Sequence, residues 1–125
     1  HAEITVRLTQ QDVDDIMVSA LEGGICYWCD RVTVEGQYLG KYASEQISRG
    51  GTLKVHVTEP FDEQDTEWYE LDIEKFIQGF RLWLENSGDC YGAVSGDGKV
   101  DCGEIDAGCA DAIIQYALFG EVVYG

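Results

Sequence analysis

Two different periods of apolar residues divide this chain, and they limit its fold more than any other feature. Apolar residues three and four positions apart predict helices. They occur over about 10–22, from Asp72 to Asn86 and from Asp106 to Gly120. Alternating apolar and polar residues predict half-buried strands. They occur over 4–8, 31–35, 53–58 and 68–71. We therefore predict an α+β fold, an antiparallel sheet of about four strands with three helices packed on it.

Residues that favour helix ends flank these helical segments. Thr9, Asp72 and Asp106 precede them as N-caps, because their side-chain oxygens can accept hydrogen bonds from the free amides of the first turn. Gly23-Gly24 and Gly120 follow the first and last segments, where a glycine in the left-handed conformation closes a helix. The tail after Gly120 either adds a short edge strand or tucks under the sheet.

The chain has 125 residues, which is the usual size of one domain. It contains one proline and no low-complexity linker or internal repeat, so we predict a single domain over 1–125. No segment approaches the roughly 18 apolar residues of a membrane span, and no charged and then apolar leader precedes the first strand. A soluble protein is expected.

The charge of the chain is strongly negative. There are 24 Asp and Glu residues against 8 Lys and Arg, which gives a formal net charge of −16 and a pI near 4.1. Such a surface repels phosphate backbones and anionic lipids, so direct binding to nucleic acid or membranes is disfavoured. Cationic partners are favoured instead.

The chain has an odd number of cysteines, five, which argues against a disulfide framework and for a reducing compartment. Cys26 and Cys29 have the C-x-x-C spacing of zinc knuckles and redox sites. Two further zinc ligands are not evident, and Tyr27 and Trp28 lie between the thiols where a redox site favours small residues or proline. We predict reduced cysteines that act as small apolar side chains, with zinc or redox chemistry as alternatives.

A second metal candidate is the segment from Asp97 to Glu104. It matches the second half of a twelve-residue calcium loop, including the glycine at Gly98 and the final glutamate. Ala93 and Ser95 stand where the loop begins, so the first ligands are missing. We predict a tight turn here and assign no metal or other cofactor, with calcium as the alternative.

Catalytic residues are sparse. We do not expect His1 to act as a ligand, so His56 is the candidate imidazole base. It falls on the polar face of a predicted strand, where a solvated residue is the simpler interpretation. No Ser-His-Asp arrangement is evident, and the glycine pairs lack the residues of a phosphate-binding loop. We predict that the protein is not an enzyme.

Acidic residues are concentrated between Glu59 and Glu74. This segment has eight acids and no base, set among Phe61, Trp68 and Tyr69. A solvated hairpin is the simplest interpretation, but the aromatic residues could anchor a protein interface. The predicted partner-binding residues are Asp62, Glu63, Asp65, Glu67, Trp68, Tyr69, Glu70, Asp72 and Glu74.

Two sequence blocks point to a family. Ala20-Leu21-Glu22-Gly23-Gly24 is followed by Tyr27-Trp28, and the tail over 111–125 contains Leu118-Phe119-Gly120-Glu121 and Val122-Val123-Tyr124-Gly125. These blocks resemble a family of small acidic proteins carried by bacteriophages and mobile elements of gut Firmicutes. The resemblance implies the cytoplasm of an infected bacterium. Such proteins are similar in character to anti-CRISPR inhibitors, several of which cover the cationic DNA-binding surfaces of Cas9.

These observations give one leading hypothesis, an inhibitor that occupies the basic nucleic-acid-binding groove of a host defence effector, most plausibly Cas9, by imitating polyanionic nucleic acid. One alternative is a binding protein for a small ligand, such as a sponge for a nucleotide signal. The residues expected to hold that ligand are Gly23, Gly24, Tyr27, Trp28, Gln115 and Tyr116. Another alternative is a phage accessory or structural protein.

Overall fold

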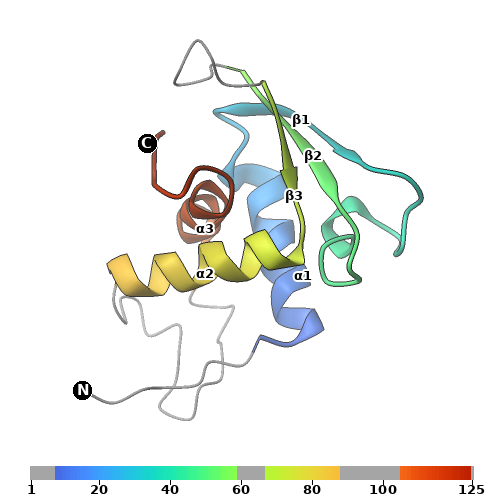
Figure 1. The fold of residues 1–125 in the computed structure, drawn as a ribbon, viewed down its shortest axis with the longest axis horizontal. Coiled ribbons are helices and arrows are strands. Elements are labelled where there is room, and N and C mark those ends of the chain that lie inside the picture. The colour runs from blue at the N-terminus through green and yellow to red at the C-terminus, as the bar shows by residue number, and fades with distance from the viewer. Residues whose placement is uncertain (1–7, 59–66, 88–104, 125) are drawn as a thin grey trace.

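A computed structural model describes residues 8–58, 67–87 and 105–124. In Figure 1 the helices lie together on one side of the strands. The elements in chain order are α1 (Gln10–Ser19), the π-helical turn η1 (Ala20–Gly24), β1 (Cys29–Val34), the 3-10 turn η2 (Ala43–Glu45), β2 (Leu53–Val57), β3 (Trp68–Leu71), α2 (Ile73–Ser87) and α3 (Ala107–Phe119). The predicted α+β class is confirmed. None of the described helices is long and apolar enough to cross a membrane.

The strands form one antiparallel sheet in the order β1-β2-β3, so β2 is central. The prediction of about four strands is wrong in this detail, because the described residues contribute three. The predicted strand over 4–8 lies outside the described residues except for Leu8, which belongs to no strand. Leu8 and Val13 occupy the two positions of a hydrophobic staple around the N-cap Thr9, so Leu8 packs at the start of α1 instead.

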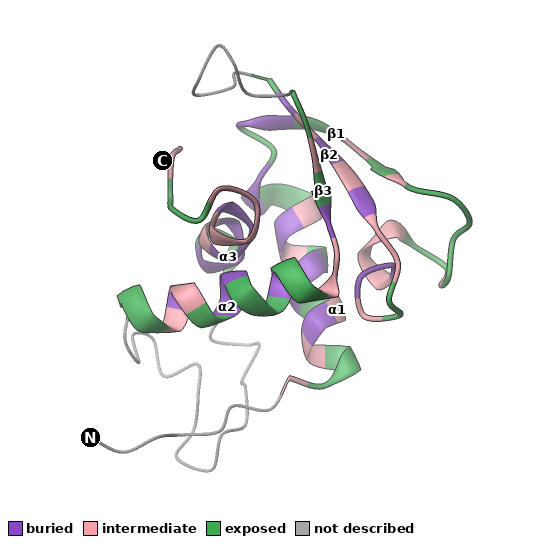
Figure 2. Cartoon of the chain, in the orientation of Figure 1, coloured by how far each residue is buried: buried purple, intermediate pink, exposed green. Residues whose placement is uncertain are grey.

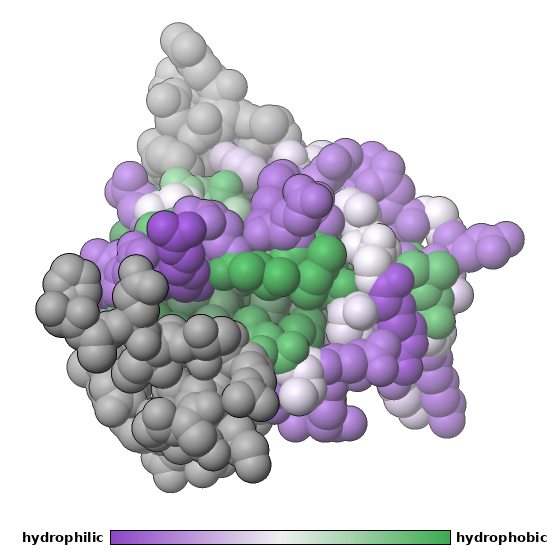
Figure 3. All heavy atoms as spheres, turned by 60° about the horizontal axis from the view of Figure 1, so that its bottom comes forward, coloured by the Kyte–Doolittle hydropathy of each residue, from purple (hydrophilic) through white to green (hydrophobic). Residues whose placement is uncertain are grey.

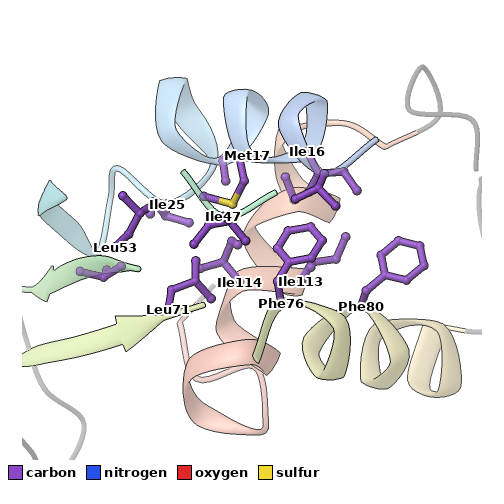
Figure 4. Packing of buried hydrophobic residues seen from close by; sticks show 14 of the residues in the cluster. Ile16, Met17, Ile25, Ile47, Leu53, Leu71, Phe76, Phe80, Ile113 and Ile114 are labelled. Atoms are coloured by element: carbon purple, nitrogen blue, oxygen red, sulfur yellow. The ribbon is translucent and has the colours of Figure 1, made fainter. Parts of the chain in front are cut away.

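One face of the sheet is buried against the helices. Leu53, Val55 and Val57 of β2 are buried, while the alternating Lys54 and His56 are only half-buried (Figure 2). Figure 4 shows the buried side chains of the strands facing apolar side chains from all three helices. The other face, which we call the outer face, is open to solvent. A sheet with one buried face is the arrangement that the alternating sequence predicts.

The predicted helix starts are confirmed. Thr9 and Asp12 form a capping box, in which the Thr9 hydroxyl accepts from the Asp12 amide at 3.1 Å and the Asp12 carboxylate accepts from the Thr9 amide at 2.9 Å. Asp72 accepts from the Lys75 amide at 2.9 Å. Asp106 accepts from the Cys109 amide at 2.8 Å. Each cap satisfies an amide that has no partner within its helix.

The predicted end of the first helix is wrong in detail. The chain does not close through a left-handed glycine at Gly23 or Gly24; it widens into η1, where the Ile25 amide donates to the Ala20 carbonyl at 3.0 Å. Gly24 instead permits close packing, because an added Cβ would lie 2.6 Å from the Ala107 carbonyl oxygen at the start of α3. Gly120 does close α3 in the left-handed conformation, with φ of 77°.

Candidate functional site

The outer face of the sheet carries a cluster of charged and aromatic side chains. Arg31, His56 and Trp68 lie opposite one another across β1, β2 and β3. Asp30 sits at an irregularity of the β1 register, between the pairs made by Cys29 and Arg31. A bulge of this kind sets two consecutive residues of one strand against one residue of its neighbour. The bulge therefore places both Asp30 and Arg31 beside His56.

His56 is held between two carboxylates. Its Nδ1 lies 2.5 Å from Asp30 Oδ1 and its Nε2 lies 3.3 Å from Glu67 Oε2. The hydrogen bond to Asp30, helped by Glu67, raises the pKa of His56, and the same bond lowers the pKa of Asp30. The predicted position of His56 on the polar face is confirmed. Its two acidic partners make it an ion-paired residue and not a freely solvated one.

Trp68 completes this group, which we call the outer-face cluster (Asp30, Arg31, His56, Glu67 and Trp68). Trp68 is 38% exposed, its ring centroid lies 4.7 Å from that of His56, and the Arg31 guanidinium carbon lies 5.9 Å from its ring centroid. An aromatic ring held by neighbours and still open to solvent loses little conformational entropy on binding. The cluster can therefore present Trp68 to a partner protein.

The structure separates the remaining predicted partner-binding residues. Glu70 and Glu74 are exposed, and Asp72 caps α2. Tyr69 points to the opposite face from Trp68, where its ring packs edge-on against Phe119 with centroids 5.0 Å apart. Its position does not suit an anchor for a partner. Asp62, Glu63 and Asp65 lie outside the described residues.

The described acidic side chains are not confined to the sheet. Exposed carboxylates also occur on α1, at Asp15, on η1, at Glu22, on α2, at Glu85, and in the tail, at Glu121. On the face turned forward in Figure 3, hydrophilic side chains border a band of apolar ones. The polar surface is therefore interrupted there, and the outer-face cluster is one of several acidic regions.

A second polar cluster joins the buried side chains of Trp28, Asp111 and Gln115 to the hydroxyl of Tyr27, a residue that is 57% exposed. The buried Asp111 carboxylate accepts three hydrogen bonds: from the Tyr27 hydroxyl at 2.5 Å, from Trp28 Nε1 at 2.7 Å and from Gln115 Nε2 at 2.9 Å. Burial of its hydroxyl and the bond to Asp111 raise the pKa of Tyr27 to about 12. Buried polar groups need hydrogen-bond partners, and here the side chains of the cluster serve as partners for one another.

Gln115 extends this cluster to the C-terminal tail. Its Oε1 accepts from the amides of Val123 and Tyr124 at 2.7 and 2.8 Å, and its Nε2 donates to the Tyr124 carbonyl at 2.9 Å. The Tyr124 ring stacks on Trp28 with centroids 5.6 Å apart. Of the two predicted alternatives for the tail, tucking against the core is the closer description, because 122–124 form no strand.

These contacts bear on the predicted ligand-binding residues. The structure brings Tyr27, Trp28 and Gln115 together, but Trp28 is buried and the polar groups bond to one another and to the tail. Tyr116 is half-buried against the core, and Gly24 serves helix packing. The arrangement is that of a structural network, which we call the Asp111 network (Tyr27, Trp28, Asp111, Gln115 and Tyr124).

Cys26 and Cys29 line a pocket of about 290 Å³ beside β1. Neither forms a disulfide, and Cys90 and Cys102 lie outside the described residues. Burial raises the pKa of the Cys29 thiol, which disfavours the reactive thiolate. Within 8–58, 67–87 and 105–124, no three His, Cys, Asp or Glu side chains are grouped to hold a metal ion. The candidate calcium loop at 97–104 is outside these ranges.

Two important residues, Asp30 and Asp111, are absent from the sites predicted from sequence. Asp111 had a detectable signal, since Asp111 and Gln115 are one turn apart in a helix whose other side chains are mostly apolar. Polar side chains in such a helix call for buried partners. For Asp30 we find no signal, because its contact with His56 depends on the irregular pairing of β1. No family model, curated protein or solved structure matches this chain.

Proposed function

We propose that this protein is a stoichiometric inhibitor that binds a cationic, nucleic-acid-binding groove on a host defence enzyme, with Cas9 as the first target to test. The observation that carries the proposal is the exposed Trp68 on a segment rich in carboxylates, flanked by Glu67 and Glu70. Interfaces draw most of their binding energy from a few such aromatic anchors surrounded by polar residues.

Electrostatics supply the second part of the argument. A net charge of −16 accelerates association with a basic groove and disfavours binding to nucleic acid itself. The outer face also holds Arg31, Lys54 and His56, so it is not uniformly acidic. We therefore assign the attraction to the whole chain and the local contact to Trp68, Glu67 and Glu70.

Nucleic-acid displacement tests this proposal. The inhibitor should compete with guide-directed DNA binding by Cas9, and its affinity should fall as the salt concentration rises. In the double variant Glu67→Lys/Glu70→Lys we expect weaker inhibition than in a double variant of equal charge change at Glu22→Lys/Glu85→Lys, which lies on η1 and α2. Trp68→Ala should weaken binding by about tenfold or more, since truncating an anchor costs roughly 1.4 kcal/mol or more.

The outcomes separate a specific surface from a general charge effect. If both double variants lose inhibition equally and Trp68→Ala has no effect, the outer face does not make the contact. If the unchanged protein neither binds Cas9 nor displaces DNA at low salt, the proposed target is wrong. Circular dichroism and thermal melting of each variant ensure that a loss of inhibition is not a loss of fold.

A further inference from the structure

Within the described part of the chain, β1 forms an edge of the sheet and pairs with a neighbour on one side only. β2 is the neighbour of β1 on one side, and no described strand pairs with its other side. The Glu35 amide donates to the Thr52 carbonyl at 3.0 Å, so Glu35 and, by alternation, Thr33 and Arg31 direct their amides and carbonyls to the β2 side. The amides and carbonyls of Val32 and Val34 therefore point away from the sheet.

The side chains along this edge are also incompletely covered. Val32 and Val34 share the inner face with Val55 and Leu53, their partners on β2. Those partners are buried, whereas Val32 and Val34 are half-buried. An uncovered edge strand with apolar side chains is a template for pairing with another strand.

Two apolar features adjoin the edge. One is the pocket of about 290 Å³, whose lining includes Leu21 and Ile25 together with Cys29 to Val32 of β1. The other is the loop after β1, where Tyr38, Leu39 and Tyr42 are 60%, 49% and 58% exposed. Three large exposed apolar residues within five positions are typical of a binding surface.

Hydrogen bonds fix this loop in place. The buried Gln46 side chain accepts from the Leu39 amide at 3.0 Å and donates to the Gln37 carbonyl at 3.1 Å. The Glu45 carboxylate accepts from the amides of Lys41 and Tyr42 at 2.7 and 3.1 Å. The backbone that carries the exposed side chains is thus fixed before any partner arrives, which lowers the entropic cost of binding.

We propose that a second copy of this chain pairs with β1 in an antiparallel manner, which joins two sheets into one across a two-fold axis at Thr33. In this register Val32 of each copy lies opposite Val34 of the other, and their outward amides and carbonyls bond to one another. Arg31 of each copy lies opposite Glu35 of the other on the outer face. This charge complementarity selects the register and the occupant.

The same register explains both apolar features. Residues are paired so that their numbers sum to 66, which places Gln37 of one copy opposite Cys29 of the other. The loop with Tyr38 and Leu39 therefore starts beside the partner's pocket, where these side chains can be covered. Arg31 would exchange its contact with the Trp68 ring, at 5.9 Å, for an ion pair with Glu35 of the second copy.

Net charge predicts an unusual salt dependence for this dimer. Each copy carries a charge of −16, so the two copies repel one another over long range. The Debye length falls from roughly 10 Å at 0.1 M salt to about 3 Å at 1 M salt, which removes this repulsion. Dimerisation should therefore strengthen as salt rises, whereas binding to a basic target should weaken.

A charge swap followed by analytical ultracentrifugation tests the proposal. Arg31→Glu and Glu35→Arg each place like charges opposite one another and should shift the chain toward monomer by about tenfold in dissociation constant. The combined Arg31→Glu/Glu35→Arg variant restores the ion pairs and should recover the dimer. Leu39→Ser tests the loop, and Glu85→Arg on α2 serves as a charge control away from the β1 edge.

Three results would overturn the proposal: a chain that stays monomeric at millimolar concentration in high salt, a double variant that fails to recover the dimer while it stays folded, or a dimer indifferent to both single variants. Each leaves the proposed function untouched, because inhibition of a basic target is measured at low salt with the monomer. Loss of inhibition in Trp68→Ala likewise leaves the dimer untouched.

Discussion

The two polar clusters of this protein use the same chemistry in opposite surroundings. In each, a carboxylate accepts hydrogen bonds from an aromatic or imidazole side chain that comes from a distant part of the chain. In the Asp111 network the carboxylate is buried and its donors are a hydroxyl, an indole and an amide. In the outer-face cluster the carboxylates of Asp30 and Glu67 are exposed and their partner is the titratable His56.

Burial decides what each cluster contributes. A polar group removed from water must keep its partners, so loss of one bond in the Asp111 network leaves another group unsatisfied. Groups on the outer face can turn to water, and an exposed ion pair stabilises a fold little. The interior cluster therefore holds the tail and α3 in place, while the outer cluster contributes little to the stability of the fold.

Removal of Gln115 should have the largest effect. Gln115→Ala leaves the amides of Val123 and Tyr124 and the Tyr124 carbonyl without their side-chain partner. We expect the free energy of unfolding to fall by about 2–4 kcal/mol, as for other buried polar groups that lose several bonds. Denaturant unfolding followed by tryptophan fluorescence measures this change.

The matched control is Gln78→Ala on the exposed side of α2. It removes a glutamine side chain that faces solvent, so the free energy of unfolding should change by no more than about 0.5 kcal/mol. Equal effects of the two substitutions would mean that Gln115 does not hold the tail.

Removal of the Tyr27 hydroxyl should have an intermediate effect. Tyr27→Phe deletes the hydroxyl, whose single proton lies between Asp111 at 2.5 Å and the Tyr124 carbonyl at 3.1 Å, and should cost about 1 kcal/mol. Because its pKa is raised to about 12, ionisation of Tyr27 opposes folding. Its stabilising contribution is therefore complete below the usual tyrosine pKa of about 10 and is lost as the pH rises through about 12.

Tyrosinate absorbance across this pH range provides the measurement. One tyrosine of the unchanged protein should titrate near 12 and be missing from the titration of Tyr27→Phe. Tyr38 is about as exposed as Tyr27, at 60% against 57%, but its hydroxyl does not contact Asp111, so Tyr38→Phe should leave stability unchanged. If Tyr27→Phe does not alter the tyrosinate titration near pH 12, the Tyr27 hydroxyl is not held by Asp111.

Sequence patterns located the elements of the fold because those patterns depend on neighbours in the chain. The stripe with Val13 and Ile16 and the cap at Thr9 require only helical geometry, and they predicted α1 to within a few residues. The alternation in β2 likewise predicted which side chains are buried. The π-helical turn escaped prediction because it depends on how closely Gly24 approaches α3.

Contacts between distant segments could not be predicted in the same way. Tyr27 and Asp111 are 84 positions apart, and Asp30 and His56 are 26 apart. The sequence predicts Tyr27 and Gln115 as ligand-binding residues, because aromatic and amide side chains suit both a ligand site and a structural hydrogen-bond network. The packing of η1 against α3 decides which side chains Tyr27 and Gln115 contact. The irregular pairing of β1 decides that Asp30 contacts His56.

The smallest effect on stability is expected at the outer-face cluster. A substitution there should instead change the pKa of His56. Asp30→Asn should lower the pKa of His56, because the hydrogen bond to Asp30 raises it most, and Glu67→Gln should lower it less. Since the pKa of His56 is raised and that of Asp30 is lowered, the pair stabilises the fold between about pH 4 and 6.5 and less as the pH rises through the raised histidine pKa. NMR titration of the His56 ring, assigned with His56→Gln, measures both shifts. If Asp30→Asn leaves the His56 titration unchanged, the bulge does not hold Asp30 against the imidazole ring. The outer-face cluster would then not be a titratable counterpart of the buried Asp111 network.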